Sequence, residues 1–227
     1  QVKLTSVVHD AADDLHALDP ERGIACGQVV LRQGTNAEHS AELAFQQGTL
    51  PDVTLTGDGS RLRQVVTNIV GNIHRYTPSD SPVEISIGVL PASISPESLS
   101  RMPANERSLR HLVEAIEVGQ SMQVGMNYAV IRFSDHGPGV PAEARSKIFE
   151  RFYTADPSRA RQKGGTGLGM AIAQSVVRAH HGFICASASE GTGLTLTVVL
   201  PIAPVEPHPM TSADAERRSE RKNRHGK

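Results

Sequence analysis

Apolar residues recur at the spacing of an amphipathic helix in two long stretches of the chain. The first covers residues 4–18 and is expected to end before Pro20, because proline cannot continue a helix. The second is expected to begin after Asp58, a candidate N-cap, and to end before Pro78. Its apolar stripe consists of Leu62, Val65, Val66, Ile69, Val70 and Ile73. Both patterns predict helices that bury one face.

Shorter stretches with alternating or β-branched residues predict five strands. They cover residues 24–31, 83–89, 128–134, 183–187 and 194–200. The second and third of these strands are expected to pair antiparallel. The last two are expected to form a hairpin across Glu190 and Gly191, which closes the domain.

Three stretches lack this periodicity. Residues 32–50 have a weak, polar pattern, and we expect an irregular insertion there. Residues 90–127 place 38 residues between two paired strands, where a hairpin needs a handful. This second insertion is either a tolerated surface loop or a functional one, with a short helix expected around residues 109–118. Residues 204–227 form a charged tail that we expect to be disordered, because acidic residues interrupt its basic run.

Bulk composition is typical of a soluble globular protein, with 38% apolar and 21% charged residues. The net charge of −1 offers nucleic acid no electrostatic attraction, so we expect no nucleic-acid partner. Cys26 and Cys185 lie far apart and outside metal-ligand spacing, which favours a reducing, cytoplasmic setting over disulfides or zinc. No apolar run approaches the roughly 20 residues that span a bilayer. The start at Gln1 rather than methionine suggests a fragment of a longer protein.

Polar residues form a line along the second predicted helix. Asn68, Asn72 and Arg75 stand at positions i, i+4 and i+7, beside the apolar stripe. Asparagine is a poor helix former, so two of them one turn apart favour a polar pocket. Taken alone, the same pattern also fits ordinary surface residues.

The run from Asp135 to Gly139 follows a predicted strand directly. An aspartate at a strand end can accept a hydrogen bond from an exocyclic amine such as that of adenine. Gly137 and Gly139 would let the backbone approach a flat ring closely. Alone this motif is weak, because Asp and Gly are common in turns after strands.

A second glycine-rich run, residues 164–169, opens a predicted helix over residues 168–179 for which Gly182 is the expected end signal. Bare backbone amides at a helix N-terminus form a phosphate site. The run is neither a Walker loop, since no Gly-Lys-Ser/Thr ends it, nor a Rossmann fingerprint, since no strand leads into it. Residues 141–163 lie before it and look like a lid anchored by Phe149 and Phe152, for which plain core packing is the alternative interpretation.

Together these motifs resemble the conserved boxes of the histidine kinase catalytic domain, within the ATPase group that includes gyrase, heat-shock chaperones and mismatch-repair proteins. The resemblance covers about residues 4–201 and rests on four motifs in the family's order. They are Asn68 with Asn72, Asp135 with Gly137 and Gly139, Phe149 with Phe152, and Gly165 with Gly167 and Gly169. Each motif alone is weak, whereas four in order are specific.

The resemblance implies a two-layer α/β sandwich, with a mixed sheet covered on one face by helices and a mobile ATP lid. It implies a leading helix over residues 1–19 and an ATP-binding catalytic domain over residues 20–203. Asn68, Asn72 and Arg75 would be catalytic, and Asn72 would hold Mg²⁺. The implied ATP-binding residues are Asn72, Arg75, Tyr76, Asp135, Gly137, Gly139, Phe152, Tyr153, Gly165, Thr166, Gly167, Leu168, Gly169 and Thr195.

One position separates the possible functions. Hydrolytic ATPases and serine kinases of this group resemble each other in carrying a glutamate four residues before the metal-binding asparagine, and here that residue is Asn68. An amide cannot act as a general base, whereas a neutral imidazole acceptor already offers a lone pair. The resemblance therefore favours a histidine kinase, with an anti-sigma-type serine kinase or ATPase as the alternative.

The sequence departs from the family's pattern at three positions. Ile73 replaces a usual alanine and His136 a usual asparagine, and neither change affects the chemistry. Thr154 stands where many relatives carry an arginine that reaches the terminal phosphate. Arg159 and Arg161 are the candidates to replace it.

The resemblance also implies partners. The acceptor histidine is expected on a separate dimerisation domain of the same protein, because His9, the only histidine that precedes an acidic residue, lacks the following proline. A response regulator would receive the phosphoryl group on an aspartate. The full-length protein is expected to be a homodimer anchored in the bacterial inner membrane, with this domain in the cytoplasm.

Overall fold

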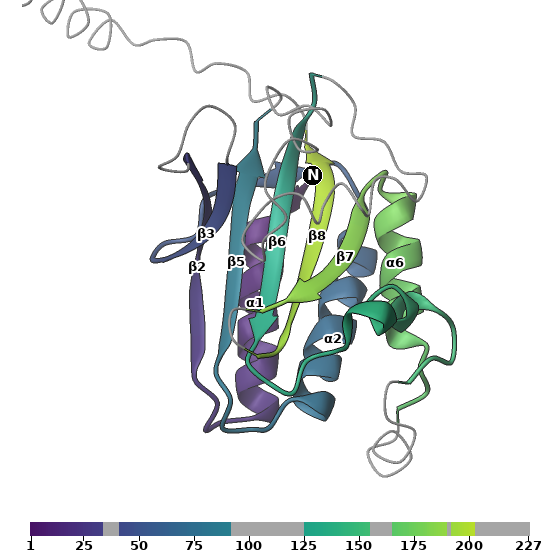
Figure 1. Ribbon diagram of the computed structural model, residues 1–227. Coiled ribbons are helices and arrows are strands. Elements are labelled where there is room, and N and C mark those ends of the chain that lie inside the picture. Colours follow the sequence, from purple (N-terminus) through teal and green to yellow (C-terminus); the bar gives the residue numbers. More distant parts are fainter. Residues whose placement is uncertain (34–40, 92–124, 155–164, 190–191, 203–227) are drawn as a thin grey trace, which may run out of the picture.

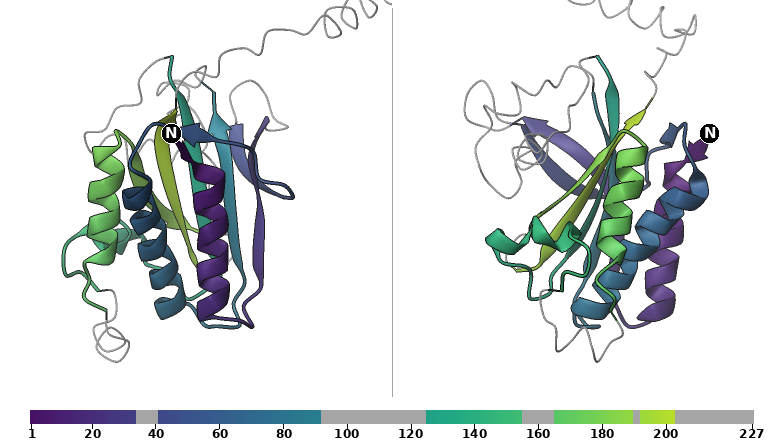
Figure 2. Two further views of the ribbon diagram at one scale, coloured as in Figure 1. Left: turned by 180° about the vertical axis from the view of Figure 1, so that it is seen from behind. Right: turned by 90° about the vertical axis from the view of Figure 1, so that its right-hand side faces the viewer.

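A computed structural model describes residues 1–33, 41–91, 125–154, 165–189 and 192–202. Within them, a six-stranded mixed sheet is covered on one face by three α-helices (Figure 1). The right-hand view of Figure 2 shows α1, α2 and α6 together on the same side of the sheet. The expected two-layer α/β sandwich is confirmed.

The sheet has the order β3-β2-β5-β6-β8-β7. Its strands are β2 (Ile24–Gln33), β3 (Ala41–Gln47), β5 (Val83–Leu90), β6 (Asn127–Asp135), β7 (Phe183–Ala188) and β8 (Leu194–Ile202). The pair β2–β5 is parallel, and the other neighbours are antiparallel. The expected antiparallel pair β5–β6 and the expected hairpin β7–β8 are therefore confirmed. A two-stranded antiparallel sheet joins β1 (Val2–Lys3) to β4 (Thr54–Leu55).

The helices follow the predicted periodicity. They are α1 (Leu4–Leu18), α2 (Gly59–Tyr76) and α6 (Gly169–Ala179), with short 3₁₀ turns η1 (Ala142–Ala144) and η2 (Lys147–Phe149). The predicted N-cap of α2 is confirmed, because the Asp58 carboxylate accepts a hydrogen bond from the Arg61 amide at 3.1 Å. No helix in the described part of the chain is long and apolar enough to cross a membrane.

The hydrophobic core lies between the helices and the sheet. Alternate residues of each strand point toward the helices, as the period of two requires. Those on the central strands are buried, among them Val83, Ile85, Ile87, Ala129, Ile131, Phe133, Leu196, Val198 and Leu200. The predicted stripe of α2 packs on them, and so does α1 through Leu4, Val8, Ala11 and Leu15. Burying each large aliphatic side chain contributes about 1.5–3 kcal/mol, so these faces fix the positions of the helices.

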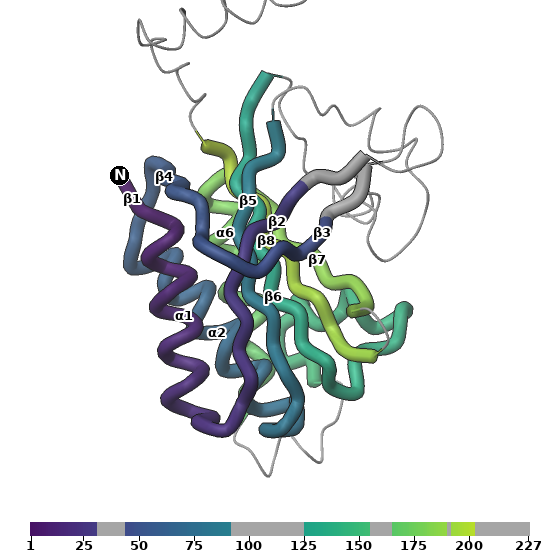
Figure 3. Tube along the Cα trace, turned by 90° about the vertical axis from the view of Figure 1, so that its left-hand side faces the viewer, coloured from purple at the N-terminus to yellow at the C-terminus, as the bar shows by residue number. Residues whose placement is uncertain are grey.

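The expectation of an irregular insertion over residues 32–50 is wrong in part. Strand β2 continues to Gln33, and β3 pairs antiparallel with it at the edge of the sheet seen in Figure 3. An edge strand has one neighbour and tolerates polar residues, so its sequence lacks the strong apolar alternation of a central strand. A Cβ on Gly88 would lie 2.2 Å from the Val29 carbonyl oxygen, so glycine is required where β5 lies close beside its parallel neighbour β2.

The end of α6 also differs from expectation. His181, not Gly182, adopts the left-handed conformation, with φ of 59°. The Gly182 amide donates to the Val177 carbonyl at 3.0 Å. A Cβ on Gly182 would lie 2.2 Å from the carbonyl oxygen of Val199, so this glycine is needed for the close approach to β8.

Several predictions lie outside the described residues. These are most of the insertion at 90–127 with its short helix at 109–118, the charged tail at 204–227, and the lid residues from 155 onward.

Candidate functional site

A cavity of about 800 Å³ opens between α2, the start of α6, and the loop that follows β6. Eleven of the residues predicted for the site line it: Asn68, Asn72, Arg75, Tyr76, Asp135, Gly139, Tyr153, Thr166, Gly167, Leu168 and Gly169. They come from three segments far apart in the sequence, which the fold brings together. Ile73, Met170 and Leu196 form an apolar wall of the cavity.

Asp135 forms one polar end of the cavity. It is the last residue of β6 and is 7% exposed. Its Oδ1 accepts hydrogen bonds from the Gly137 amide at 2.9 Å and the Leu194 amide at 3.4 Å, and the Thr77 hydroxyl also bonds its carboxyl group. Burial raises the pKa of Asp135 although these hydrogen bonds lower it. The carboxyl group is thus fixed in one orientation.

Close backbone packing holds the turn after Asp135. Gly139 has φ of 71°, and a Cβ on it would lie 2.8 Å from the Gly193 carbonyl oxygen. A Cβ on Gly137 would lie 2.9 Å from Cγ2 of Thr77 and 3.0 Å from Oδ1 of Asp135. Gly137 is not among the cavity's lining residues. The two predicted glycines therefore let this turn pack closely against α2 and the β7–β8 hairpin.

Asn68 lies where α2 meets the first residue of α6. A Cβ on Gly169 would lie 3.3 Å from Oδ1 of Asn68. Nδ2 of Asn68 is buried, and within the described structure it has no hydrogen-bond partner. An unpaired buried donor costs about 1–3 kcal/mol, which a ligand oxygen in the cavity would offset. Asn72 and Arg75 line the cavity further along α2.

The glycine-rich run forms the second polar end. Gly167 has φ of 67°, and a Cβ on it would lie 2.7 Å from the backbone carbon of Phe152. The Phe152 amide donates to the Gly167 carbonyl at 2.9 Å, so the segment after β6 and this run are joined. No side chain in the described structure caps the start of α6. Its first amides are therefore available to an anion. Gly165 lies beside α2, since a Cβ on it would be 3.0 Å from the Tyr76 hydroxyl.

The proposed anchoring by two phenylalanines holds for one of them. Phe149 is buried in the core, whereas Phe152 is 72% exposed and has φ of 66°. Phe152 follows the 3₁₀ turn, where its backbone rather than its ring meets Gly167. Thr154 lines the cavity, and the candidates Arg159 and Arg161 lie outside the described residues.

Thr195 was also predicted to bind ATP. It does not line the cavity, because the alternation along β8 turns it to the opposite face of the sheet from Leu194 and Leu196. Its side chain is buried, and its hydroxyl donates to Ser134 Oγ at 2.9 Å and lies 3.0 Å from Ser189 Oγ. Leu194, one residue earlier, lines the cavity and donates its amide to Asp135.

Sequence reasoning missed Thr77. It is the C-cap of α2, is 4% exposed, lines the cavity and bonds Asp135. Its place between Tyr76 and Pro78, at the predicted end of the helix, could have indicated a capping residue that faces the pocket.

The cavity fits a nucleotide. A buried carboxylate suits the adenine amine, the apolar wall suits the ring, and the amides of α6 with Arg75 suit phosphates. The unpaired Nδ2 of Asn68 supports the same assignment, because such a group needs an acceptor. An amide oxygen at Asn72 fits Mg²⁺, which takes few protein ligands beside water and phosphate oxygens.

Fold and site together define an α/β sandwich domain with a cavity of mixed polar and apolar lining between α2, the start of α6 and the loop after β6. The sequence matches the family described as "Histidine kinase-, DNA gyrase B-, and HSP90-like ATPase" over residues 57–204. This match covers more than half of the 227 residues. The chain therefore belongs to this family.

Two curated relatives illustrate the similarity. The "Probable sensor histidine kinase TcrY" of Mycobacterium tuberculosis is 36% identical over 139 residues, which are 61% of this chain and 22% of that protein. The "Signal transduction histidine-protein kinase BaeS" of Escherichia coli is 34% identical over 157 residues, which are 69% of this chain and 26% of that protein. The chain thus spans about a quarter of the length of these relatives.

Solved structures show the same fold. A mycobacterial sensor histidine kinase, MprB, has a TM-score of 0.53 at 20% identity, and the match covers 88% of this chain and 95% of that one. Full-length ShkA in complex with AMPPNP has a TM-score of 0.53 at 20% identity, with 91% of this chain and 31% of that one covered.

Proposed function

We propose that this chain is the ATP-binding catalytic domain of a sensor histidine kinase, which binds ATP with Mg²⁺ and transfers the γ-phosphoryl group to a histidine. The observation that carries the proposal concerns Asn68, four residues before Asn72. It lies beside the start of α6, and among the described residues its amide nitrogen has no hydrogen-bond partner. Hydrolytic members of the family resemble each other in having a glutamate at this position. An amide can donate a hydrogen bond to a phosphate oxygen but cannot take a proton from water.

Different residues bind different parts of ATP. The carboxylate of Asp135 accepts the adenine amine, and the apolar wall holds the ring. The amides at the start of α6, with the Arg75 guanidinium, bind phosphate oxygens and orient the terminal phosphate outward. The Asn72 amide oxygen would hold Mg²⁺, which would supply charge neutralisation for the phosphates. These groups position ATP and provide no general base.

Phosphoryl transfer to histidine needs no such base. The lone pair of a neutral imidazole nitrogen forms the new N–P bond while the bond from the γ-phosphorus to the bridging oxygen breaks, and ADP leaves with that electron pair. Catalysis then consists of positioning and charge stabilisation, which is what the cavity provides.

The remaining elements of the proposal concern the whole protein. The acceptor histidine would lie on a separate dimerisation domain, and a response regulator aspartate would take the phosphoryl group next. The full-length protein would be a homodimer anchored in the inner membrane, with this domain in the cytoplasm. The support is that the curated relatives are named sensor or signal transduction histidine kinases and that the chain spans about a quarter of their length.

A transfer assay tests the proposal. The purified chain is incubated with γ-labelled ATP and Mg²⁺, alone and with a separate protein made of histidine kinase dimerisation helices that carry an acceptor histidine. We expect label on the added helices only, acid-labile and base-stable. Acceptor helices with the histidine replaced by glutamine are the control. Steady release of labelled phosphate without transfer would instead establish an ATPase, and acid-stable label would establish a serine kinase.

A further inference from the structure

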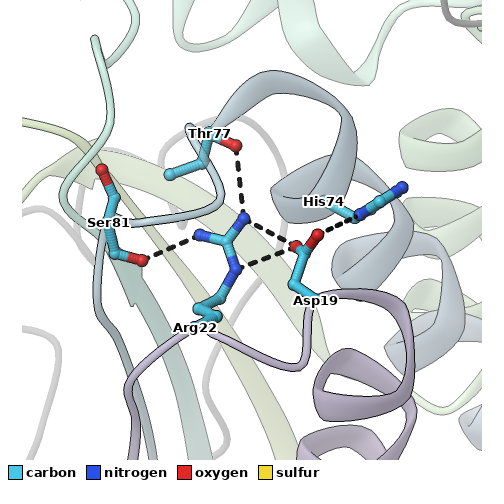
Figure 4. A network of polar contacts seen from close by, with 5 residues as sticks. All are labelled: Asp19, Arg22, His74, Thr77 and Ser81. Carbon is cyan, nitrogen blue, oxygen red and sulfur yellow. Dashed lines mark hydrogen bonds and ion pairs between the residues drawn. The ribbon is translucent and has the colours of Figure 1, made fainter.

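A buried polar network joins the end of α1 to the end of α2 (Figure 4). Nε and Nη2 of Arg22 donate to Oδ2 of Asp19 at 2.9 and 2.7 Å. Nη1 of Arg22 donates to the Ser81 carbonyl at 2.9 Å, and Nη2 also donates to the Thr77 carbonyl at 3.3 Å. On the other side, Nδ1 of His74 lies 2.9 Å from Oδ1 of Asp19.

Arg22 is the centre of this network. Its side chain is fully buried, whereas most arginines lie at the surface. Burying a guanidinium is costly unless its donors are satisfied, and here a carboxylate and two carbonyls satisfy them. Two of these acceptors, at Thr77 and Ser81, belong to the end of α2 and the turn that follows. A cation is favoured there because the helix dipole places negative charge at this end.

The network ends at the nucleotide cavity. Thr77 receives the Arg22 hydrogen bond at its carbonyl and bonds the Asp135 carboxyl through its hydroxyl. The methyl group of Thr77 also contacts the turn at Gly137, where an added Cβ would lie only 2.9 Å away. Arg22 itself does not line the cavity. A displacement of Thr77 would therefore change the orientation of the carboxyl group without any direct contact between Arg22 and the ligand.

We propose that Arg22 is a positioning residue for the adenine end of the site. It holds the C-cap of α2 so that the Thr77 hydroxyl fixes the Asp135 carboxylate toward the ligand, and Asp19 in turn fixes the guanidinium. This inference rests on the proposed function insofar as ATP is the ligand. It adds a residue 113 positions before Asp135 that none of the sequence motifs contains.

Calorimetric titration with ATP provides the first test. We expect Arg22→Gln to weaken ATP binding about 5-fold, which is the effect of one misplaced hydrogen bond. Arg22→Lys should weaken it less, because lysine keeps the positive charge but lacks the planar set of guanidinium N–H donors. The control is Arg63→Gln. Arg63 also joins α1 to α2, through ion pairs with Asp10 and Asp14, but it is half exposed and away from the cavity. Affinities are referred to the folded fraction measured by circular dichroism.

A double-mutant cycle separates positioning from general stability. Thr77→Val removes the hydroxyl through which Arg22 acts, so Arg22→Lys should cost no further affinity in that background. An equal loss in both backgrounds would show that Arg22 does not act through Thr77 and would overturn the inference.

Amide spectra of the ligand-free protein provide an independent readout. The Gly137 and Leu194 amides donate to Oδ1 of Asp135, so their ¹H–¹⁵N signals report its position. We expect both signals to move in Arg22→Lys and to stay in place in Arg63→Gln. Unmoved signals with unchanged ATP affinity would overturn the inference. If the wild-type chain bound no ATP, the proposed function would fail, while these signals would still decide whether Arg22 positions Asp135.

Discussion

The imidazole of His180 links the two helices that enclose the cavity. Its Nε2 accepts a hydrogen bond from the Asp58 amide at 3.0 Å, at the start of α2, and its Nδ1 lies 2.8 Å from the Val176 carbonyl at the end of α6. An amide must donate and a carbonyl must accept, so the ring is neutral with its hydrogen on Nδ1.

We therefore expect His180→Ala to lower the free energy of unfolding by about 1–2 kcal/mol, because it leaves the Asp58 amide without its acceptor. The Val176 carbonyl loses the ring as a partner but keeps the hydrogen bond from the backbone amide of residue 180. Urea unfolding followed by circular dichroism measures the change. His9→Ala, an exposed position on α1, is the matched control and should change stability by less than about 0.5 kcal/mol. Equal effects of the two substitutions would show that the His180 side chain does not stabilise the fold by joining α2 to α6.

The second prediction concerns Asp135→Asn. The Gly137 and Leu194 amides would hold the new amide oxygen in the place of Oδ1, so the NH₂ group would take the place of the other oxygen. An NH₂ group cannot accept from the adenine amine, and the loss of affinity for ATP should be about 5- to 150-fold. Calorimetry measures it, and Asp80→Asn at an exposed turn is the control. Unchanged affinity would exclude Asp135 from the site.

The same residue predicts a pH dependence. Burial raises the pKa of Asp135 although hydrogen bonds from Gly137, Leu194 and Thr77 lower it. In the proposed site the ionised carboxylate would accept from the adenine amine, so ATP binding should weaken as the pH falls through this raised pKa, by up to about 10-fold per pH unit. The decline should begin at a higher pH than for an ordinary aspartate. In Asp135→Asn the decline of ATP affinity at low pH should be absent. If the affinity still declined, another titrating group would be responsible.

Asp19 should make the stability of the fold depend on pH, and its pKa is shifted in the opposite direction to that of Asp135. Burial raises its pKa, but hydrogen bonds from Arg22 and His74 outweigh burial and leave the pKa lowered. A lowered pKa in the folded state contributes stability above the unfolded pKa and loses it as the pH falls through the folded value. Asp19→Asn should therefore flatten the acid limb of a stability curve measured by urea unfolding at successive pH values. An unchanged acid limb would show that the ion pair contributes nothing there.

Most of the fold could be predicted because burial imposes a period on the sequence. The stripe of α2 and the alternation of β5 and β6 both face one core, and their bounds agreed with the structure to within one or two residues. Strand β3 could not be predicted, because an edge strand buries too little to require that pattern.

The residues that line the cavity could be predicted where local motifs supply them, and not where contacts between distant parts of the chain decide. Gly139 and Gly167 adopt positive φ, a conformation that favours glycine, so the turns that need it can be recognised from glycines in the sequence. Whether Leu194 or Thr195 lines the cavity depends on which face of β8 meets it, and a shift of one residue along the strand reverses that face. The bond from Arg22 to Thr77 joins residues 55 positions apart, and no local pattern reports it.

The last prediction tests the metal ligand. Asn72 lines the cavity on α2, one turn after Asn68, and its amide oxygen is the expected ligand of Mg²⁺. Asn72→Ala should weaken ATP binding mainly when Mg²⁺ is present, because Mg²⁺ retains its water and phosphate ligands and loses its protein one. Calorimetric titrations with Mg²⁺ and with a chelator give both affinities. Asn68→Ala is the matched comparison. In the proposed site its buried amide nitrogen would donate to a phosphate oxygen directly, so its loss should be similar in both conditions. An equal loss for Asn72→Ala with and without the metal would assign that residue to the nucleotide instead.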